Sequence, residues 1–233
     1  LGTSNPSPED VARVSVVVDS NSLGVRGDLG ATVLAVLFDP EARTLPAAGS
    51  NAGKLREPLL RKAHLFRVLD ANAVDYGRFR EWWSNYLGQW PMSSPSVFNF
   101  FQPDFSPPGE LFNLGLTAPE FQITNDTTVA TVAQGLGGQI YWSWRGNNGQ
   151  FPEDIVVDLS DGMALADDPV KLVDYYDLLL MNRTMSDFMF ETLVAHAQAV
   201  ARWDGVVDED HLRERVQDTV WLIVTSPEYV IER

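Results

Sequence analysis

The 233-residue chain is 45% hydrophobic and 11% aromatic, has no cysteine, and carries a formal net charge of −15. Its length suits one large domain or two small ones, and the missing cysteines exclude disulfides and thiolate metal sites. The acidic balance argues against binding to nucleic acids or anionic lipids, and no apolar run is long enough to span a membrane.

The first two helices are predicted by their capping residues. The stretch Ser7-Pro8-Glu9-Asp10 is typical of a helix start, because serine caps, proline is tolerated in the first turn and acids favour the positive end of the helix dipole. We expect one helix over residues 8–19 and a second over residues 28–38. A glycine-containing break separates them, and an Asp-Pro pair ends the second.

Residues 54–80 are locally basic, with seven basic and three acidic side chains. Their apolar spacing predicts a helix on which Glu57 is placed to pair with Arg61. One interpretation is a solvated helix face or an internal partner for the acidic last third, and the interleaved acids favour it. The other is an anion site built on Arg61, His64 and Arg67.

A helix over residues 76–86 is expected to precede an irregular connector, residues 94–124. The first sixteen connector residues, SPSVFNFFQPDFSPPG, hold four phenylalanines and four prolines, which exclude a regular helix or a central strand. Burying four phenylalanines gains roughly 6–12 kcal/mol, whereas ordering sixteen residues costs roughly 16–32 kcal/mol of backbone entropy. The stretch therefore needs neighbouring helices or a partner to order it.

Two interpretations of this connector stay open. We favour a buried plug between the N-terminal and C-terminal helices. The other is an aromatic-walled groove for a sugar or an apolar ligand, with these binding residues: Phe98, Asn99, Phe100, Phe101, Gln102, Asp104 and Phe105.

Asn125 is expected to cap a long helix that contains Gly135, Gly137 and Gly138. Each glycine costs about 1 kcal/mol relative to alanine, so three together either weaken the helix or let another part of the chain approach closely. The only strand expected from the sequence is short and lies within residues 154–160.

The last third is the most regular part of the sequence. Apolar spacing predicts helices over residues 169–181, 185–200 and 212–223, and the short joins favour a three-helix unit. His196 falls on the apolar stripe of the second helix. We interpret it as a packed, hydrogen-bonded core histidine rather than as a metal ligand.

The sequence contains no recognisable catalytic or cofactor motif. The patterns HExxH, GxSxG, SxxK, GxGxxG and the phosphate loop are all missing. Acidic pairs are frequent, but a catalytic pair requires one raised pKa and a cleft, and neither can be recognised from sequence. We therefore expect no metal and no cofactor, and we assign no catalytic residue.

Six stretches carry a family resemblance: NPSPEDVARV, GVRGDLGATVLAVLFDPEAR, LREPLLR, PSVFNFFQPDFSPPG, APEFQI and SPEYVIER. In this order they resemble the C-terminal half of the bacterial domain-of-unknown-function family 1800 (DUF1800). The resemblance implies a mostly helical, exported protein of the periplasm or the extracellular space. It also implies a further helical half before Leu1, and it supplies no reaction, cofactor or catalytic residue.

We therefore expect an all-α fold with long Pro/Phe-rich connections and a C-terminal three-helix unit. It would form a single helical domain, with N-terminal helices (1–93), the connector (94–124) and acidic C-terminal helices (125–233).

Our first functional hypothesis is a non-catalytic binding or assembly module of an exported complex, which docks its missing N-terminal half or another exported protein through the aromatic stretch Ser94–Gly109. One alternative is half of a periplasmic or extracellular hydrolase of polysaccharide or another polymer, with Asp104 and Glu120 in a cleft. A further alternative is a self-associating surface or matrix protein.

Overall fold

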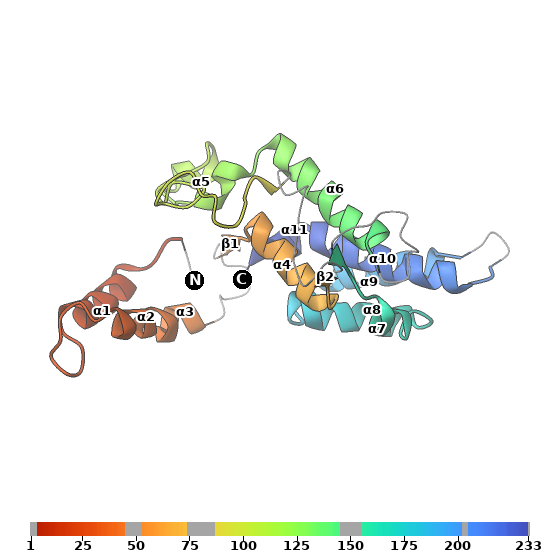
Figure 1. Cartoon of the computed structure of the whole chain (residues 1–233), viewed down its shortest axis with the longest axis horizontal. Coiled ribbons are helices and arrows are strands. Elements are labelled where there is room, and N and C mark those ends of the chain that lie inside the picture. The colour runs from red at the N-terminus through yellow and green to blue at the C-terminus, as the bar shows by residue number, and fades with distance from the viewer. Residues whose placement is uncertain (1–3, 45–52, 74–86, 145–154, 202–204, 233) are drawn as a thin grey trace. The chain divides into compact units, whose positions relative to one another are not determined.

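The computed structural model describes residues 4–44, 53–73, 87–144, 155–201 and 205–232 (Figure 1). Helices dominate this part of the chain, and its strands are four two-residue segments, so the expected all-α class is confirmed. No helix within these ranges is long and apolar enough to cross a membrane. The helix predicted over residues 76–86 lies outside the described residues.

The chain gathers into two compact units, and each is assembled from separate stretches of sequence. Unit 1 consists of Leu1–Leu55, Phe101–Gln122 and Ile231–Arg233, and unit 2 consists of Arg56–Phe100 and Ile123–Val230. The single domain expected from the sequence stays a prediction.

Unit 1 is built from short helices and one small pair of strands. Its elements are α1 (Pro8–Asp19), α2 (Leu29–Phe38), α3 (Pro40–Arg43), β1 (Lys54–Leu55), α5 (Glu110–Asn113), the 3₁₀-helix η2 (Pro119–Ile123), whose last residue belongs to unit 2, and β4 (Ile231–Glu232). Strand β1 pairs antiparallel with β4, so Lys54 lies opposite Glu232.

Helices α1 and α2 begin where the sequence predicts, because a side chain caps each first turn. The Ser7 hydroxyl and the Asp28 carboxylate accept hydrogen bonds from backbone N–H groups three residues later. The two helices pack against each other, and the Arg13 guanidinium donates to both oxygens of Asp39 at 2.6 and 2.7 Å. This hydrogen bonding lowers the pKa of Asp39 to about 2.

Unit 2 contains most of the long helices. Its elements are α4 (Pro58–Val68), β2 (Asn72–Ala73), α6 (Asp126–Trp142), β3 (Ile155–Val156), α7 (Ser160–Met163), α8 (Pro169–Tyr176), the π-helix η3 (Asp177–Met181), α9 (Asp187–Ala199), α10 (Glu209–Thr225) and α11 (Pro227–Val230). Strand β3 falls within the predicted range and pairs antiparallel with β2. The three helices predicted at the end of the chain are present as α8 with η3, α9 and α10.

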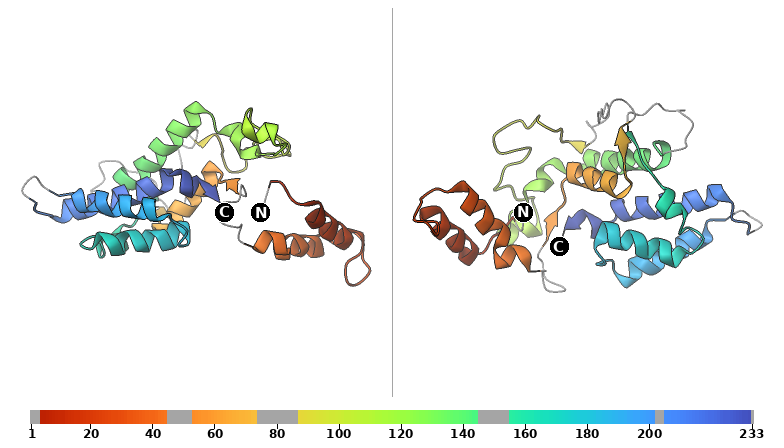
Figure 2. Two further views of the ribbon diagram at one scale, coloured as in Figure 1. Left: turned by 180° about the vertical axis from the view of Figure 1, so that it is seen from behind. Right: turned by 60° about the horizontal axis from the view of Figure 1, so that its bottom comes forward.

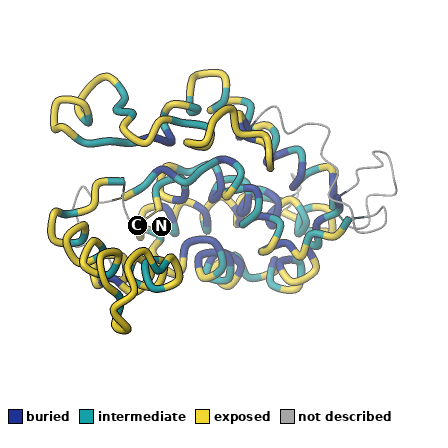
Figure 3. The backbone as a smooth tube through the Cα atoms, turned by 60° about the vertical axis from the view of Figure 1, so that its left-hand side comes forward, coloured by how far each residue is buried: buried dark blue, intermediate teal, exposed yellow. Residues whose placement is uncertain are grey.

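Helix α10 lies at the centre of unit 2 and contacts α6, α7, α8, α9 and α11 (Figures 1 and 2). Its buried side includes Val216, Val220, Ile223 and Val224, all of which are fully buried. Burying one such side chain contributes about 1.5–3 kcal/mol. The same core continues through other elements of the unit: Leu65, Leu136, Ile140, Leu172, Tyr176 and Leu193. In Figure 3 the buried residues gather in these helices, whereas α1 and α2 contain none.

None of the four connector phenylalanines is buried. Phe98 is 57% exposed, and Phe100, Phe101 and Phe105 are half-buried. The buried plug favoured from the sequence is therefore wrong. The stretch is held instead by turns and backbone hydrogen bonds, such as the one from the Ala118 N–H to the Phe105 carbonyl at 2.8 Å.

Helix α6 continues without a break through its glycines. A Cβ atom built on Gly137 would lie 3.1 Å from Nε1 of Trp221 on α10, whereas one built on Gly138 would meet nothing within 4 Å. The sequence predicted that the glycines either weaken the helix or let another part of the chain approach closely. The close approach is found at Gly137, where α10 contacts α6, and not at Gly138.

We predict opposite effects for alanine at these two positions. Gly138→Ala should raise the free energy of unfolding by about 0.5–1 kcal/mol, because alanine favours the helix. Gly137→Ala gains the same propensity but crowds Trp221, and overpacking costs about 1–3 kcal/mol, so its net effect should be destabilising. Urea unfolding followed by far-UV circular dichroism measures both. Equal stabilisation by the two substitutions would contradict the close contact between α6 and α10.

Candidate functional site

A cluster of cationic and aromatic side chains forms where α4 meets α11. We call Arg56, Arg61, His64 and Tyr229 the α4 cluster. The guanidinium carbon of Arg56 lies 4.3 Å from the centre of the Tyr229 ring. The imidazole of His64 stacks on the same ring, with centroids 5.8 Å apart and planes at 17°. One buried tyrosine therefore positions two of the basic groups.

Backbone carbonyls fix the orientation of the cluster. Nη2 of Arg61 donates to the Val224 carbonyl at 2.9 Å, and Nε2 of His64 lies 3.1 Å from the Leu179 carbonyl. Leu179 is in the last turn of η3, where carbonyls lack helical partners. Because only an N–H can donate to a carbonyl, Nε2 carries the proton. Nδ1 of His64 is then the acceptor, and both Nη1 of Arg56 and the Tyr229 hydroxyl lie 3.2 Å from it.

The electrostatic environment of Arg61 is unfavourable for a cation. Burial lowers the pKa of its guanidinium; the nearby Tyr229 acts in the opposite direction, and the charge of Arg56 again lowers this pKa. Its Nε atom is buried and has no hydrogen-bond partner among the described residues. Glu57 does not supply the missing charge, because its carboxylate accepts a hydrogen bond from Gln89 at 2.6 Å. The Glu57–Arg61 pair predicted from the sequence is therefore wrong.

The structure changes the membership of the predicted anion site. It brings Arg61 and His64 together, but Arg67 is exposed and does not belong to the cluster. Sequence reasoning missed Arg56 and Tyr229. Their only signal was that they occur in LREPLLR and SPEYVIER, two of the stretches that carry the family resemblance. Binding of an anion there stays a prediction.

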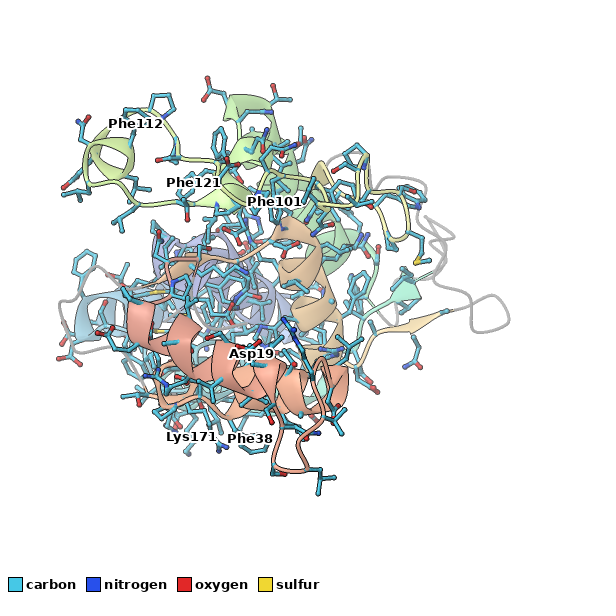
Figure 4. The ribbon with its side chains drawn as sticks, turned by 90° about the vertical axis from the view of Figure 1, so that its left-hand side faces the viewer. Asp19, Phe38, Phe101, Phe112, Phe121 and Lys171 are labelled. Carbon is cyan, nitrogen blue, oxygen red and sulfur yellow. The ribbon has the colours of Figure 1, made fainter. Side chains whose placement is uncertain are left out.

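The connector residues present a different surface. Asn99, Gln102 and Asp104, the polar residues proposed to line a groove, are exposed. The backbone N–H of Gln102 donates to the side chain of Gln122 at 2.6 Å. Figure 4 labels Phe101 in this part of the chain and shows neighbouring side chains as sticks. A ligand groove at these residues stays a prediction.

The two acids of the hydrolase hypothesis have unlike environments. Glu120 is 2% exposed, and its carboxylate lies 3.0 Å from the ammonium group of Lys54. Asp104 is exposed. A buried carboxylate neutralised by lysine is typical of a structural ion pair, so these residues give the hydrolase hypothesis no support.

His196 is not the core histidine that the apolar stripe predicts. Its side chain is 44% exposed, and Nε2 lies 2.7 Å from one carboxylate oxygen of Asp218. The other oxygen accepts the Tyr141 hydroxyl at 2.5 Å, and burial together with this bond raises the pKa of Tyr141. The expected stripe is misplaced by one residue at this point, because the buried positions of α9 are Met189, Leu193 and Ala197. No three potential metal-ligating side chains are grouped within the described ranges.

Comparison with known proteins gives one match. Residues 1–231 match the family model described as "Protein of unknown function (DUF1800)". A search of curated proteins and a search of solved structures each found no significant match.

Two carboxylates in and beside η3, the segment that binds His64, have pKa values shifted in opposite directions. Asp177 is buried, which raises its pKa, and its carboxylate accepts the Met185 N–H at 3.2 Å. Asp174 lies 2.5 Å from the Arg183 guanidinium, and that hydrogen bond lowers its pKa. Replacing Asp177 by asparagine should therefore raise the stability of the protein, whereas replacing Asp174 by asparagine should lower it.

We predict that Asp177→Asn is more stable than the parent protein at pH 7. A raised folded-state pKa means that the folded state binds more protons than the unfolded state, so stability falls as pH rises above about 4. The gain should shrink as pH falls toward 4. Asp174→Asn should be less stable at pH 7, and its deficit should also shrink on acidification. Thermal unfolding between pH 4 and 8 tests both, and a destabilised Asp177→Asn variant at pH 7 would contradict the burial argument.

Proposed function

Because the chain belongs to the DUF1800 family of proteins of unknown function, membership assigns no activity, and we propose a role from the surface of unit 1. The protein is a non-catalytic binding or assembly module of an exported complex. It docks another protein chain through the apolar face of residues 8–38, which we call the α1–α2 hairpin.

The observation that carries this proposal is the exposure of the hairpin's apolar side chains. Its exposed large hydrophobic residues are 36–84% accessible: Val11, Val16, Val18, Leu23, Val25, Leu29, Val33, Leu34, Val36, Leu37 and Phe38. Helix α2, with the sequence LGATVLAVLF, has no charged side chain. Phe38, its last residue, is labelled in Figure 4. Many exposed apolar side chains on one pair of helices are typical of an interaction site.

The hairpin has internal bonds that hold its shape in the absence of a partner. The backbone N–H of Gly27 donates to the Val18 carbonyl at 2.7 Å. The Asn21 amide donates to Asp28, the residue that also caps α2, at 2.7 Å. A surface ordered in advance loses less entropy on binding than a disordered segment. These contacts therefore favour docking of a formed hairpin.

The charges on the hairpin favour a protein partner over a lipid surface. Helices that lie on membranes carry many lysines and arginines on their polar face. Helix α1 instead carries Glu9, Asp10 and Asp19 against a single base, Arg13, and α2 carries no base. Anionic head groups would be repelled by this arrangement.

The location and the kind of partner are further parts of the proposal. An exported location rests on the family resemblance, and the missing cysteines are compatible with an oxidising compartment. Recovery of the native protein in the cytosolic fraction would contradict it. The partner is another exported protein or a helical half of the same protein.

We predict that the double variant Val33→Gln with Leu34→Gln loses its partner. Both side chains are 55% exposed, and glutamine preserves helix propensity. Each lost apolar contact is worth up to about 1.5–3 kcal/mol, so affinity should fall at least about tenfold. The measurement is tagged co-purification of the full-length protein from its native source. The partner is then purified and titrated against both forms.

The matched control is Val129→Gln with Val170→Gln, two exposed apolar residues on α6 and α8. This variant removes similar apolar surface outside the hairpin and should keep full affinity. An unchanged partner with the hairpin variant, or equal loss with the control, would refute the docking surface. Analytical sedimentation of the purified chain tests for self-association. An oligomer that only the hairpin variant dissociates would show that the partner is a second copy of this chain and not a different protein.

A further inference from the structure

The α4 cluster stands out because its positive charge is not compensated. No carboxylate lies within salt-bridge distance of Arg56 or Arg61 in the part of the chain that the structure describes. This occurs in a chain with 32 acidic and 17 basic side chains. Elsewhere in the same protein, Arg13 binds Asp39 and Arg183 binds Asp174. A shortage of acids does not explain the unpaired charge.

One donor of the cluster, Nε of Arg61, also lacks a hydrogen-bond acceptor among the described residues. The side chain of Arg61 is half-buried and donates one hydrogen bond, to the Val224 carbonyl, whereas its Nε atom is buried and has no acceptor in the described part of the chain. A buried donor left unsatisfied costs about 1–3 kcal/mol, and more when the group is charged. Burial lowers the pKa of this guanidinium, as expected for a cation without a counter-charge. An added negative oxygen would correct both deficits.

The donors are held in place before any ligand arrives. Tyr229 is 1% exposed and stacks against both Arg56 and His64. The imidazole is fixed at Nε2 by the Leu179 carbonyl and accepts from Arg56 at Nδ1. Because Nδ1 of His64 already accepts a hydrogen bond from Arg56, the imidazole holds that guanidinium in position. Such support from neighbouring groups is the arrangement that a binding site requires.

We propose that the α4 cluster is a binding site for a small oxyanion: a carboxylate, sulfate or phosphate group contacted by Arg56 and Arg61. Guanidinium groups match all three, because their planar N–H pairs bind two oxygens at once. The net charge of −15 disfavours long polyanions, which would meet the acidic surface beyond the cluster. The ligand is therefore a single anion or the charged end of a small molecule. This site lies in unit 2 and is independent of the docking surface proposed on unit 1.

The test is an NMR titration of the full-length chain, observing the arginine Nε–Hε resonances. Sodium acetate, sulfate and phosphate are added separately at constant ionic strength and pH, with chloride as the reference. We expect saturable shifts at Arg56 and Arg61 with at least one of the three. If only acetate gives saturable shifts, the site binds planar carboxylates. If sulfate or phosphate gives them, the site binds tetrahedral anions. Absence of saturation with all three overturns the proposal.

Substitutions decide whether the binding belongs to the cluster. Arg61→Gln and Arg56→Gln should each lower the affinity for the anion at least about tenfold, as expected for loss of a charge-assisted hydrogen bond. Arg67→Gln removes the same charge from an exposed position of α4 and should change affinity by less than about twofold, as expected for a solvent-screened charge. Equal weakening by Arg67→Gln would show a general charge effect and refute the site.

Two further variants keep the result decisive. Arg56→Lys retains the charge but loses the planar donor pair. Arg56→Lys should bind the anion more weakly than the parent protein does. It replaces the glutamine variant in the test if circular dichroism shows that the glutamine variant does not fold. Parent-like affinity in this variant would overturn the role of Arg56. The Val33→Gln, Leu34→Gln variant should keep full anion affinity, so the anion site and the docking surface can fail separately.

Discussion

Burial of the apolar side of α10 holds the other helices of unit 2 in their places. Val216, Val220 and Ile223 are fully buried, and α10 contacts five neighbouring helices. The α4 cluster depends on this packing, because Arg61 donates to a carbonyl of α10 and Tyr229 follows α10 in the chain. The cationic groups are therefore positioned by a hydrophobic scaffold that they do not themselves form.

The helices were largely predictable because their signals are local. Ser7, Asp28 and Asn125 each accept the backbone hydrogen bonds expected of a capping residue. Apolar spacing likewise located the three helices of the last third. The burial of individual side chains was less predictable. His196 follows Leu193 at helical spacing, yet Ala197 occupies the buried position of that turn and His196 reaches Asp218 instead.

The candidate site was only partly predictable because its contacts are long-range. Tyr229 lies 165 positions from His64 in sequence, and no local pattern links them. The stretches APEFQI and SPEYVI show the same limit. Both form a helical turn after a proline, but Glu120 is buried against Lys54, whereas the Glu228 carboxylate accepts the Ser186 N–H at the start of α9. The two similar sequences form similar turns, but the contacts of Glu120 and Glu228 depend on the residues that surround each turn.

The interleaving of the two units has a consequence for the order of folding. The chain passes from one unit to the other after Leu55, Phe100, Gln122 and Val230. A nascent chain emerging from the ribosome can form the α1–α2 hairpin early, because all its contacts are local. Strand β1, however, must remain without its ladder partner until residues 231–232 have been synthesised. For the same reason, neither unit can be excised or transplanted as one continuous segment.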